Sequence, residues 1–331
     1  MVDLGEILVT GADGFIGSHL VESLVEKGEK VTALCCYNSF GSFGWLQKIS
    51  QEQSSNLKLI LGDIRDSGFV EEAVLNKDTI FHLASLIAIP YSYHAPQSYF
   101  DTNTIGALNI AKASLKNKVK RVIHTSTSEV YGSARYTPID EKHPLQGQSP
   151  YSASKISADF VMESYYRSFD LPIRTLRPFN TYGPRQSLRA VIPSIISQIY
   201  SSEESVFLGS LDPLRDFTYV EDTVNAFIEL ARGPESTCGE IYNSGTGVSI
   251  SIGNLVQSIM NISGIKKNVD TDTIRLRPEK SEVNKLECDF SKIREAVNWE
   301  PKVDLNKGLE STLNWFKDQG KLLSDNGRYV I

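Results

Sequence analysis

The stretch EILVTGADGFIG, residues 6–17, decides the fold of this chain. Residues 6–10 are largely apolar, which predicts a buried strand, and residues 18–27 have the periodicity of a helix. Glycines between a strand and a helix let the backbone turn tightly and approach a pyrophosphate at the helix N-terminus, where free N–H groups favour an anion. The stretch therefore predicts a dinucleotide site formed by Gly11, Gly14, Phe15, Ile16 and Gly17.

Strands and helices alternate after this turn. We predict further strands at residues 30–35, 57–61, 79–83, 121–125 and 173–177, and helices at 66–75, 97–116 and 150–168. This alternation is typical of an α/β fold, here a Rossmann-type doubly wound parallel sheet. Such sheets bind ligands outside the carboxyl ends of their strands. The further candidates for dinucleotide contact are therefore Asp63, Ile64, Leu83, Ala84, Ser85, Thr125 and Pro178, together with Asn103 in the helix 97–116.

The end of the second strand leaves the choice of dinucleotide open. NAD proteins usually carry an acidic residue there that binds the ribose. Residues 34–38, LCCYN, offer neither an acid nor an Arg or Lys for a 2′-phosphate. The missing cation favours NAD, and NADP is not excluded.

A polar cluster begins where the fifth strand ends, in the segment 125–155. Ser149 is a good N-cap and Pro150 suits a first helical turn, so Tyr151 and Lys155 lie four apart on one helix face. A Lys⁺ held near a Tyr favours the phenolate and lowers its pKa, which predicts a general base near neutral pH. Glu129 supplies a separate proton acceptor.

The chain after residue 179 mixes helices with short strands. We expect a dinucleotide-binding domain at 1–179, joined by 217–240, and a smaller mixed α/β lobe for the substrate at 180–331. Guanidinium groups pair with phosphate in bidentate fashion, so Arg215 and Arg277 are candidates to hold a diphosphate. Asn180, in the turn after the sixth strand, and Val191, in a predicted helix at 189–200, complete the expected substrate contacts.

Composition narrows the class of protein. The chain has 331 residues and a net charge of −6, which argues against nucleic-acid binding. No apolar run approaches the ~18 residues of a membrane span. The four cysteines and five histidines have no metal-ligand spacing. Because the chain opens directly on a strand with no signal-peptide pattern, we expect reduced thiols and a cytoplasmic location.

Five motifs occur in one order: the glycine turn, STSEVYG at 126–132, YSASK at 151–155, PFNTYGPRQ at 178–186 and RDFTYVEDT at 215–223. Together they resemble the extended short-chain dehydrogenase/reductase family of nucleotide-sugar epimerases, dehydratases and decarboxylases, over essentially the whole chain. Residues 37–46, 88–94 and 138–150 further resemble the NDP-N-acetylglucosamine 4,6-dehydratases of bacterial legionaminic acid biosynthesis.

The resemblance implies roles for the cluster. Tyr151 and Lys155 would work on the sugar 4-hydroxyl and the nicotinamide ribose, and Thr127 would orient that hydroxyl. Dehydratases carry Thr-Asp-Glu or Thr-Ser-Glu where this chain has Thr127-Ser128-Glu129, so Glu129 would remove the C5 proton, and Ser128 or protonated Glu129 would help water to leave. The net reaction is loss of water from the sugar, with NAD retained between turnovers.

Three other functions compete with the 4,6-dehydratase. A decarboxylase of the UDP-glucuronate type shares Thr-Ser-Glu, but it typically has Arg after the active-site Lys, where this chain has Ile156. It also needs a cation for the substrate carboxylate, and residues 87–89 offer none. Epimerases of the family usually lack the carboxylate. A non-catalytic dinucleotide sensor would not need Glu129 together with Thr127, Tyr151 and Lys155.

The family also implies an assembly. In related enzymes the helices corresponding to 97–116 and 150–168 form a four-helix interface, and symmetric dimers are the commonest closed assembly. We therefore expect a homodimer, or a tetramer built from such dimers. The expected partner is a nucleotide-diphosphate sugar, with no nucleic acid and no membrane.

Overall fold

The computed structural model describes residues 2–47, 55–276, 278 and 281–319. Its centre is a seven-stranded sheet with the order β10-β6-β5-β4-β1-β2-β3, in which every neighbouring pair is parallel. The strands are β1 Glu6–Thr10, β2 Lys30–Cys36, β3 Leu57–Gly62, β4 Thr79–His82, β5 Arg121–Thr125, β6 Ile173–Pro178 and β10 Ile241–Ser244. The predicted doubly wound parallel sheet is confirmed.

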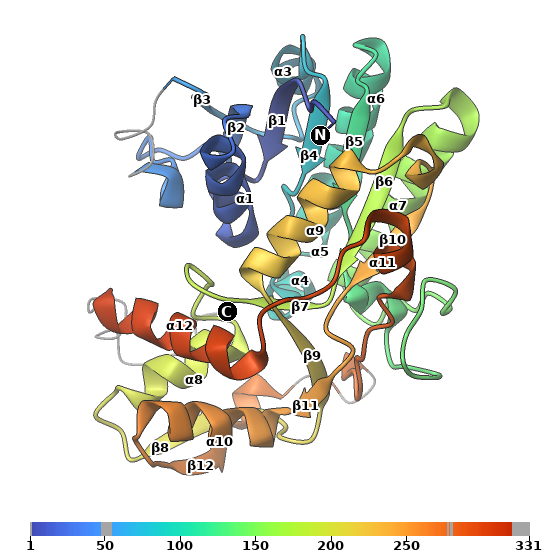
Figure 1. Ribbon diagram of the computed structural model, residues 1–331. Coiled ribbons are helices and arrows are strands. Elements are labelled where there is room, and N and C mark those ends of the chain that lie inside the picture. The colour runs from blue at the N-terminus through green and yellow to red at the C-terminus, as the bar shows by residue number, and fades with distance from the viewer. Residues whose placement is uncertain (1, 48–54, 277, 279–280, 320–331) are drawn as a thin grey trace.

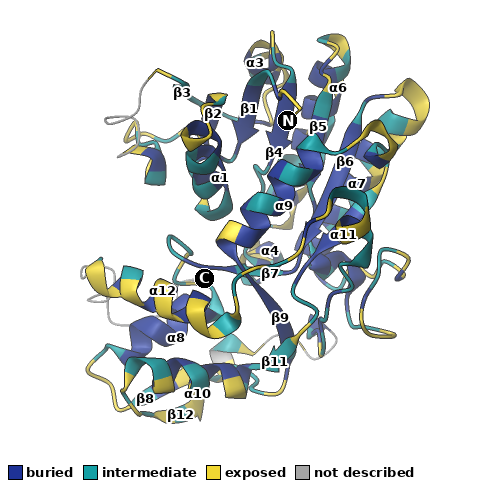
Figure 2. Ribbon diagram, in the orientation of Figure 1, coloured by how far each residue is buried: buried dark blue, intermediate teal, exposed yellow. Residues whose placement is uncertain are grey.

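Helices cover both faces of this sheet (Figure 1). On one face lie α1 Phe15–Glu26, α9 Val220–Arg232 and α11 Ser291–Val297; on the other lie α3 Ser67–Val74, α6 Gly106–Lys116 and α7 Pro150–Phe169. Alternate strand residues serve the two faces, because Ile7 and Val9 belong to the first core and Leu8 to the second. Figure 2 shows the central strands β1, β4, β5 and β6 as largely buried.

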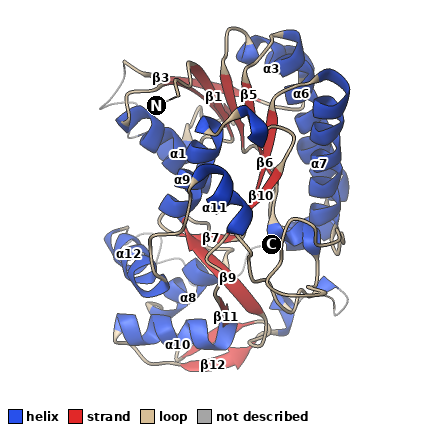
Figure 3. Ribbon diagram, turned by 45° about the vertical axis from the view of Figure 1, so that its right-hand side comes forward, coloured by secondary structure: helices blue, strands red, loops and turns tan. Residues whose placement is uncertain are grey.

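A second lobe lies below the sheet (Figure 3). It holds a sheet of order β11-β9-β7 and a parallel pair of β8 and β12, packed with three helices. Its elements are β7 Asn180–Tyr182, α8 Val191–Ile199, β8 Ser205–Leu208, β9 Leu214–Tyr219, β11 Ser249–Ser251, α10 Ile252–Ser263, β12 Asn268–Thr271 and α12 Leu305–Asp318. One apolar core runs from α1 and α9 into α8, α10 and α12.

Three local predictions needed correction. The first helix begins at Phe15, directly on the glycine turn, not at residue 18. The expected long helix at 97–116 is built from α5 Pro96–Tyr99, a π-helical turn Phe100–Ile105, and α6. The apolar segment after β4 contains a short helix, α4 Ile89–His94, because Pro90 suits a first helical turn. Strand β10 was not predicted at all.

Sequence capping accounts for the helix that carries the catalytic pair. The Ser149 hydroxyl accepts a hydrogen bond from the Ser152 amide at 3.1 Å, and the Ser152 hydroxyl accepts one from the Ser149 amide at 3.0 Å. Pro150 occupies the first turn, and the helix ends at Asp170 in a left-handed conformation. The start of α7 is therefore fixed one residue before Tyr151. Among the described residues, no helix has the length and apolar character that crossing a membrane requires.

Candidate active site

The glycine turn is packed against the neighbouring strand end. Gly11 has φ +68°, and a Cβ there would lie 2.7 Å from the backbone of Ala84. A Cβ on Gly17 would lie 2.1 Å from the Gly11 carbonyl oxygen. Gly14 is the N-cap of α1 and has no side chain to occupy the first amides. The turn thus leaves a helix N-terminus open at the carboxyl edge of the sheet, where a diphosphate can bind.

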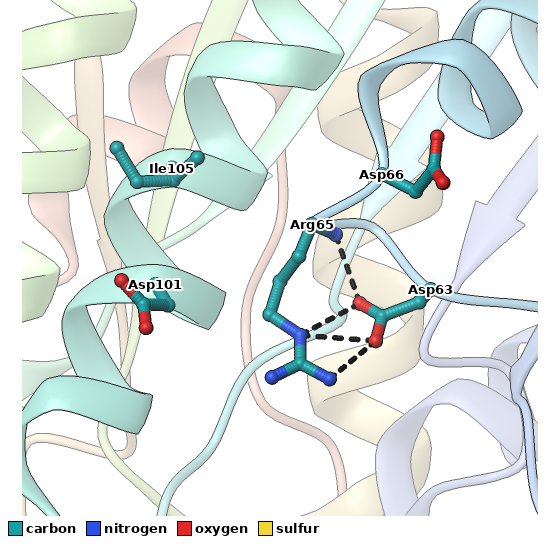
Figure 4. Close-up of a pocket in the computed structure, with 5 residues that line it drawn as sticks. All are labelled: Asp63, Arg65, Asp66, Asp101 and Ile105. Carbon is teal, nitrogen blue, oxygen red and sulfur yellow. Dashed lines mark hydrogen bonds and ion pairs between the residues drawn. The ribbon is translucent and has the colours of Figure 1, made fainter.

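Asp63 lines an open cavity of about 590 Å³ together with Arg65, Asp66, Asp101 and Ile105. Figure 4 shows Arg65 folded onto its carboxylate, with Asp101 and Ile105 on the facing helix. The Arg65 Nε atom donates to Asp63 at 2.9 Å, and the backbone amide of Arg65 donates at 2.9 Å. These bonds lower the pKa of Asp63, so it is a carboxylate held in one orientation.

The loop after β4 is fixed by two buried polar side chains. The Ala84 amide donates to the Thr10 hydroxyl at 3.1 Å. The Asn103 amide group accepts from the Leu86 amide at 2.8 Å and donates to the Leu86 carbonyl and the Ser154 hydroxyl at 3.0 and 2.9 Å. Asn103 is therefore turned toward this loop and α7, and it shapes the wall of the predicted dinucleotide site. The Ser85 hydroxyl donates to the Leu83 carbonyl at 3.3 Å.

The segment after β5 brings the predicted catalytic residues together. A short 3-10 helix, Ser128–Tyr131, follows the strand, and Thr127 caps it by accepting from the Glu129 amide at 3.2 Å. Thr127 also hydrogen-bonds the Tyr151 phenol, and Glu129 is close enough that its charge acts on that phenol. Ser128 is buried. Glu129 therefore lies on this helical turn rather than on the strand end itself.

Lys155 is buried behind Tyr151. Its ammonium donates to the Thr125 carbonyl at 2.5 Å, and burial lowers its pKa to about 8. Tyr151 is 7% exposed and its ring meets the edge of Tyr99 with centroids 6.2 Å apart. The Thr125 hydroxyl is buried and has no hydrogen-bond partner among the described residues, which leaves it available to a ligand.

The expected low pKa of Tyr151 is wrong for the chain alone. Burial raises the pKa of the phenol, and the charge of Glu129 raises it further, while the hydrogen bond with Thr127 lowers it. The reason is desolvation, which the spacing of Tyr151 and Lys155 cannot reveal. Tyr151 is therefore a neutral phenol in the chain without ligands near neutral pH.

The predicted substrate residues lie in the second lobe. Asn180 opens β7, and its side-chain oxygen is buried without a partner among the described residues. Val191 opens α8. Arg215 lies buried on β9, where its guanidinium pairs with Glu282 at 3.1 Å. Arg277 lies outside the described residues.

The remaining predicted contacts lie at the carboxyl ends of β3 and β6. Ile64 is buried after β3 and packs against Gly106, where a Cβ would meet it at 2.4 Å. Pro178 ends β6 beside Ser244 of β10. All the described dinucleotide candidates therefore lie along one edge of the sheet or line its neighbouring helix.

Sequence reasoning missed a set of buried polar residues behind the catalytic pair. Asp159, one turn after Lys155 on α7, accepts from Ser126 at 2.7 Å and pairs with Arg177 at 2.8 Å. Tyr131 receives a hydrogen bond from Arg177 at 3.0 Å. The spacing of Lys155 and Asp159, four apart, was a visible signal, but nothing in the sequence tied it to Arg177.

Comparison with known proteins finds relatives over nearly the whole chain. The family model described as GDP-mannose 4,6 dehydratase matches residues 8–312. The chain is 30% identical to the dTDP-D-glucose 4,6-dehydratase of Homo sapiens, over 94% of this chain and 90% of that protein.

Two solved structures share the fold over almost their whole length. A double mutant of DesIV, the dTDP-glucose 4,6-dehydratase of Streptomyces venezuelae, was solved with NAD; it is 26% identical, with a TM-score of 0.87, and 96% of this chain and 98% of that chain are covered. The UDP-N-acetylglucosamine 4-epimerase of Methanobrevibacter ruminantium M1 is 31% identical, with a TM-score of 0.86 and coverage of 96% and 100%.

Proposed function

The chain belongs to the GDP-mannose 4,6-dehydratase family, among the NAD-dependent epimerases and dehydratases of the extended short-chain dehydrogenase/reductase type, and from this membership we propose that it is a nucleotide-sugar 4,6-dehydratase. We propose UDP- or GDP-linked N-acetylglucosamine as its substrate and the 4-keto-6-deoxy sugar as its product. The observation that carries the proposal is Glu129, a carboxylate held beside Tyr151 by the Thr127 cap. Hydride transfer alone does not require this carboxylate, whereas removal of a proton from carbon does.

NAD fits the residues present. The glycine turn leaves no room for a Cβ at Gly11 or Gly17, and the buried Thr125 hydroxyl lacks a partner among the described residues. We propose that these residues and Asp63 would hold the dinucleotide, which the NAD-bound DesIV neighbour supports. When bound, NAD supplies the hydride acceptor and donor that a redox-neutral loss of water needs.

The side chains divide the proton transfers between them. Thr127 and Tyr151 hold the sugar 4-hydroxyl, and Tyr151 takes its proton while the Lys155 ammonium stabilises the phenolate. The resulting 4-ketone acidifies the C5 proton, which Glu129 removes. The 6-hydroxyl leaves as water with the proton that Glu129 took from C5, given directly or relayed through Ser128. Once C6 is reduced, Glu129 delivers a proton to C5; the proton that Tyr151 took from the 4-hydroxyl makes up for it by exchange through solvent, so the sugar loses one water in total and each side chain returns to its starting protonation state.

The second lobe supports a nucleotide diphosphate as the substrate's carrier. Arg215 reaches the lobe interior on β9 and is held by Glu282, so its guanidinium is oriented before any ligand arrives. The unpartnered Asn180 oxygen lies on the adjoining strand β7. We infer that Arg215 contacts the diphosphate and that Asn180 and Val191 contact the sugar-nucleotide. The described residues support no choice between uridine and guanosine.

A 4-epimerase is the second candidate, because the UDP-N-acetylglucosamine 4-epimerase structure matches the whole chain at 31% identity. Thr127, Tyr151 and Lys155 would suffice for that reaction. Glu129 favours the dehydratase, because an epimerase moves only the hydrogens at C4. The N-acetyl group and a place in legionaminic acid biosynthesis rest on the resemblance of residues 37–46, 88–94 and 138–150.

The test is incubation of the purified protein with UDP- and GDP-N-acetylglucosamine, followed by mass spectrometry. Loss of one water from either sugar supports the dehydratase. A product of unchanged mass with altered stereochemistry at C4 would establish the epimerase instead. Loss of carbon dioxide from UDP-glucuronate, with neither hexosamine consumed, would establish the decarboxylase.

We also propose that the protein is a homodimer. α6 and α7 pack side by side, and the helical surface that they share with the π-helical turn carries Phe100, Ile105 and Phe160, exposed by 36%, 43% and 57%. A second copy of the chain would cover these side chains in a four-helix interface. Light scattering should report a dimer for the wild-type protein, and Phe160→Glu should dissociate it. Phe40→Glu is the control, because Phe40 is exposed but lies outside the proposed interface helices, and it should leave the dimer intact. A monomeric wild-type protein at micromolar concentration contradicts the proposal.

A further inference from the structure

A row of buried polar side chains crosses the sheet at the carboxyl ends of its strands. Thr10 and His82 are paired in register on β1 and β4, and their side chains share a hydrogen bond of 2.9 Å. His82 is paired with His124 on β5, and their rings stack with centroids 5.7 Å apart. Arg177 on β6 is paired with Asn243 on β10. We call these five residues, with Asp159 of α7, the buried row.

Asp159 is the centre of this row. Its carboxylate accepts from the Ser126 hydroxyl at 2.7 Å, from His124 Nε2 at 3.2 Å, and from Arg177 Nε and Nη2 at 3.2 and 2.8 Å. Asp159 is 6% exposed and Arg177 is 1% exposed. A carboxylate that accepts four bonds inside the protein remains charged, and its pKa is lowered to about 2.

Burying charged and polar side chains carries a desolvation cost that an apolar core does not have. A buried ion pair is often no more stabilising than apolar side chains of the same volume. The protein nevertheless buries Asp159, Arg177 and two histidines, whose pKa values burial lowers. Perturbed ionisable groups of this kind cluster at functional sites. We therefore expect the buried row to serve the proposed proton transfers at the carboxyl ends of these strands.

Both catalytic segments are attached to Asp159. Lys155 lies four residues earlier on the same helix, so the two side chains share a helix face. Ser126, which donates to Asp159, follows the carbonyl of Thr125 that binds Lys155. Ser126 also precedes Thr127, the cap of the turn that holds Glu129.

A second connection runs through Arg177. Its Nη1 atom donates to the Tyr131 hydroxyl at 3.0 Å, and that hydroxyl donates to Asn243 at 2.7 Å. Tyr131 ends the helical turn, Ser128–Tyr131, that contains Glu129. The turn is thus held at both ends by groups bonded, directly or through Arg177, to Asp159.

The charges around Lys155 come from four elements. Tyr151 and Asp159 lie on α7, His82 on β4, His124 on β5 and Arg177 on β6. The histidines are uncharged near neutral pH because burial lowers their pKa values. Among these neighbours, Asp159 is the group whose charge favours the ammonium form of Lys155.

We propose that Asp159 is a positioning residue, which ties Tyr151 and Lys155 on α7 to the Glu129 turn through Ser126 and Arg177 and supplies the counter-charge that keeps Lys155 an ammonium. This proposal rests on the proposed function for the roles of Tyr151, Lys155 and Glu129. Its charge component can be tested without any sugar.

The test is the variant Asp159→Asn, which keeps the shape and a hydrogen-bond acceptor but removes the charge. Lys155 should then lose its proton at lower pH, because an opposite charge at close range typically shifts a pKa by about 1 unit or more. The ζ-nitrogen of Lys155 can be followed by NMR in ¹⁵N-lysine-labelled protein with its dinucleotide bound, with Lys155→Met as the assignment standard. The high-pH limb of the dehydration rate should move down by the same amount.

The variant Arg177→Gln separates charge from structure. This variant also disturbs the buried row, but it keeps the Asp159 carboxylate and removes a cation. The pH at which Lys155 loses its proton, called here the Lys155 transition, should therefore stay the same or rise. Asp222→Asn is the matched control: Asp222 is a buried Asp on α9 whose carboxylate accepts from the Val303 amide at 2.9 Å and is not part of the buried row. It should leave the transition unchanged. If Asp159→Asn does not fold, Arg177→Gln still tests the proposal, because a downward shift in it contradicts the charge assignment.

The outcomes distinguish this inference from the proposed function. If the wild-type protein dehydrates no sugar but Asp159→Asn still lowers the Lys155 transition, the proposed function fails and the charge assignment stands. If the wild-type protein dehydrates the sugar and the transition is the same in Asp159→Asn, the inference fails alone. Equal downward shifts in Asp159→Asn and Arg177→Gln would mean that the row has only a structural role.

Discussion

Glu129→Gln isolates the step that, under the proposed function, distinguishes a dehydratase from an epimerase. Glutamine keeps the length and shape of the side chain, and the Thr127 cap bonds the backbone amide of residue 129, so the turn should survive. Glutamine cannot accept a proton from carbon. The variant should therefore bind the sugar and oxidise C4, yet fail to lose water.

The structure gives the direction of each effect. The charge of Glu129 helps to raise the pKa of Tyr151, so its removal should make the Tyr151 proton easier to lose. The oxidation of C4 should then be no slower than in the wild type. Loss of a general base typically costs about 10²–10⁴-fold, which is about 2.7–5.5 kcal/mol of barrier. We expect product formation to fall within this range.

Two measurements separate the steps. Rapid mixing of the variant with its sugar nucleotide should produce nicotinamide absorbance that persists, while mass spectrometry shows little dehydrated product. In deuterated water the variant should not incorporate deuterium at C5. Tyr151→Phe is the control, because its block lies earlier and should abolish both the absorbance and the product.

Two results would refute this reasoning. A Glu129→Gln protein that forms product at close to the wild-type rate removes Glu129 from the mechanism. A variant that gives no absorbance change, although it binds the sugar nucleotide and unfolds at the wild-type denaturant concentration, would place Glu129 before C4 oxidation.

Three further predictions concern the fold around the site. Gly17→Ala forces a Cβ to within 2.1 Å of the Gly11 carbonyl, so it should lower the free energy of unfolding by about 1–3 kcal/mol in denaturant titration and reduce the NAD released on denaturation. Because the pKa of Lys155 lies at about 8 and its ammonium form is required, kcat should fall as pH rises through that value, and a rate that stays flat to well above it would contradict the role. Asp66→Ala removes the N-cap bond to the Phe69 amide at 3.0 Å and should cost about 0.5–2 kcal/mol of stability by denaturant titration, with kcat unchanged.

Local chemistry explains what the sequence predicted well. Residues 6–10 and 121–125 are strands with the expected bounds, because short apolar β-branched runs between turn residues have few other stable forms. Ser149 and Pro150 fix the start of α7 as expected, and Asp66 caps α3. Each of these features depends on residues within about one helical turn of each other.

Features set by distant partners were missed. Strand β10, Ile241–Ser244, is short and half polar, and it becomes a strand through its pairing with β6. The raised pKa of Tyr151 depends on burial by Tyr99 and the surrounding loop, which no spacing rule expresses. Arg215 was predicted as a diphosphate clamp, but its partner Glu282 follows 67 residues later and was not foreseen.

Asp159 combines a feature that can be predicted from local sequence with one that depends on distant partners. Its place one turn after Lys155 can be read from the sequence, and by itself such spacing is an ordinary helix feature. Its meaning comes from Ser126 and Arg177, which approach it only because β5 and β6 are neighbours in the sheet. Neighbouring parallel strands place their carboxyl ends side by side, so residues distant in sequence can form one buried network there. The candidate catalytic motif could thus be predicted from its residues, whereas the charge that we propose supports Lys155 could be found only once the strand order was known.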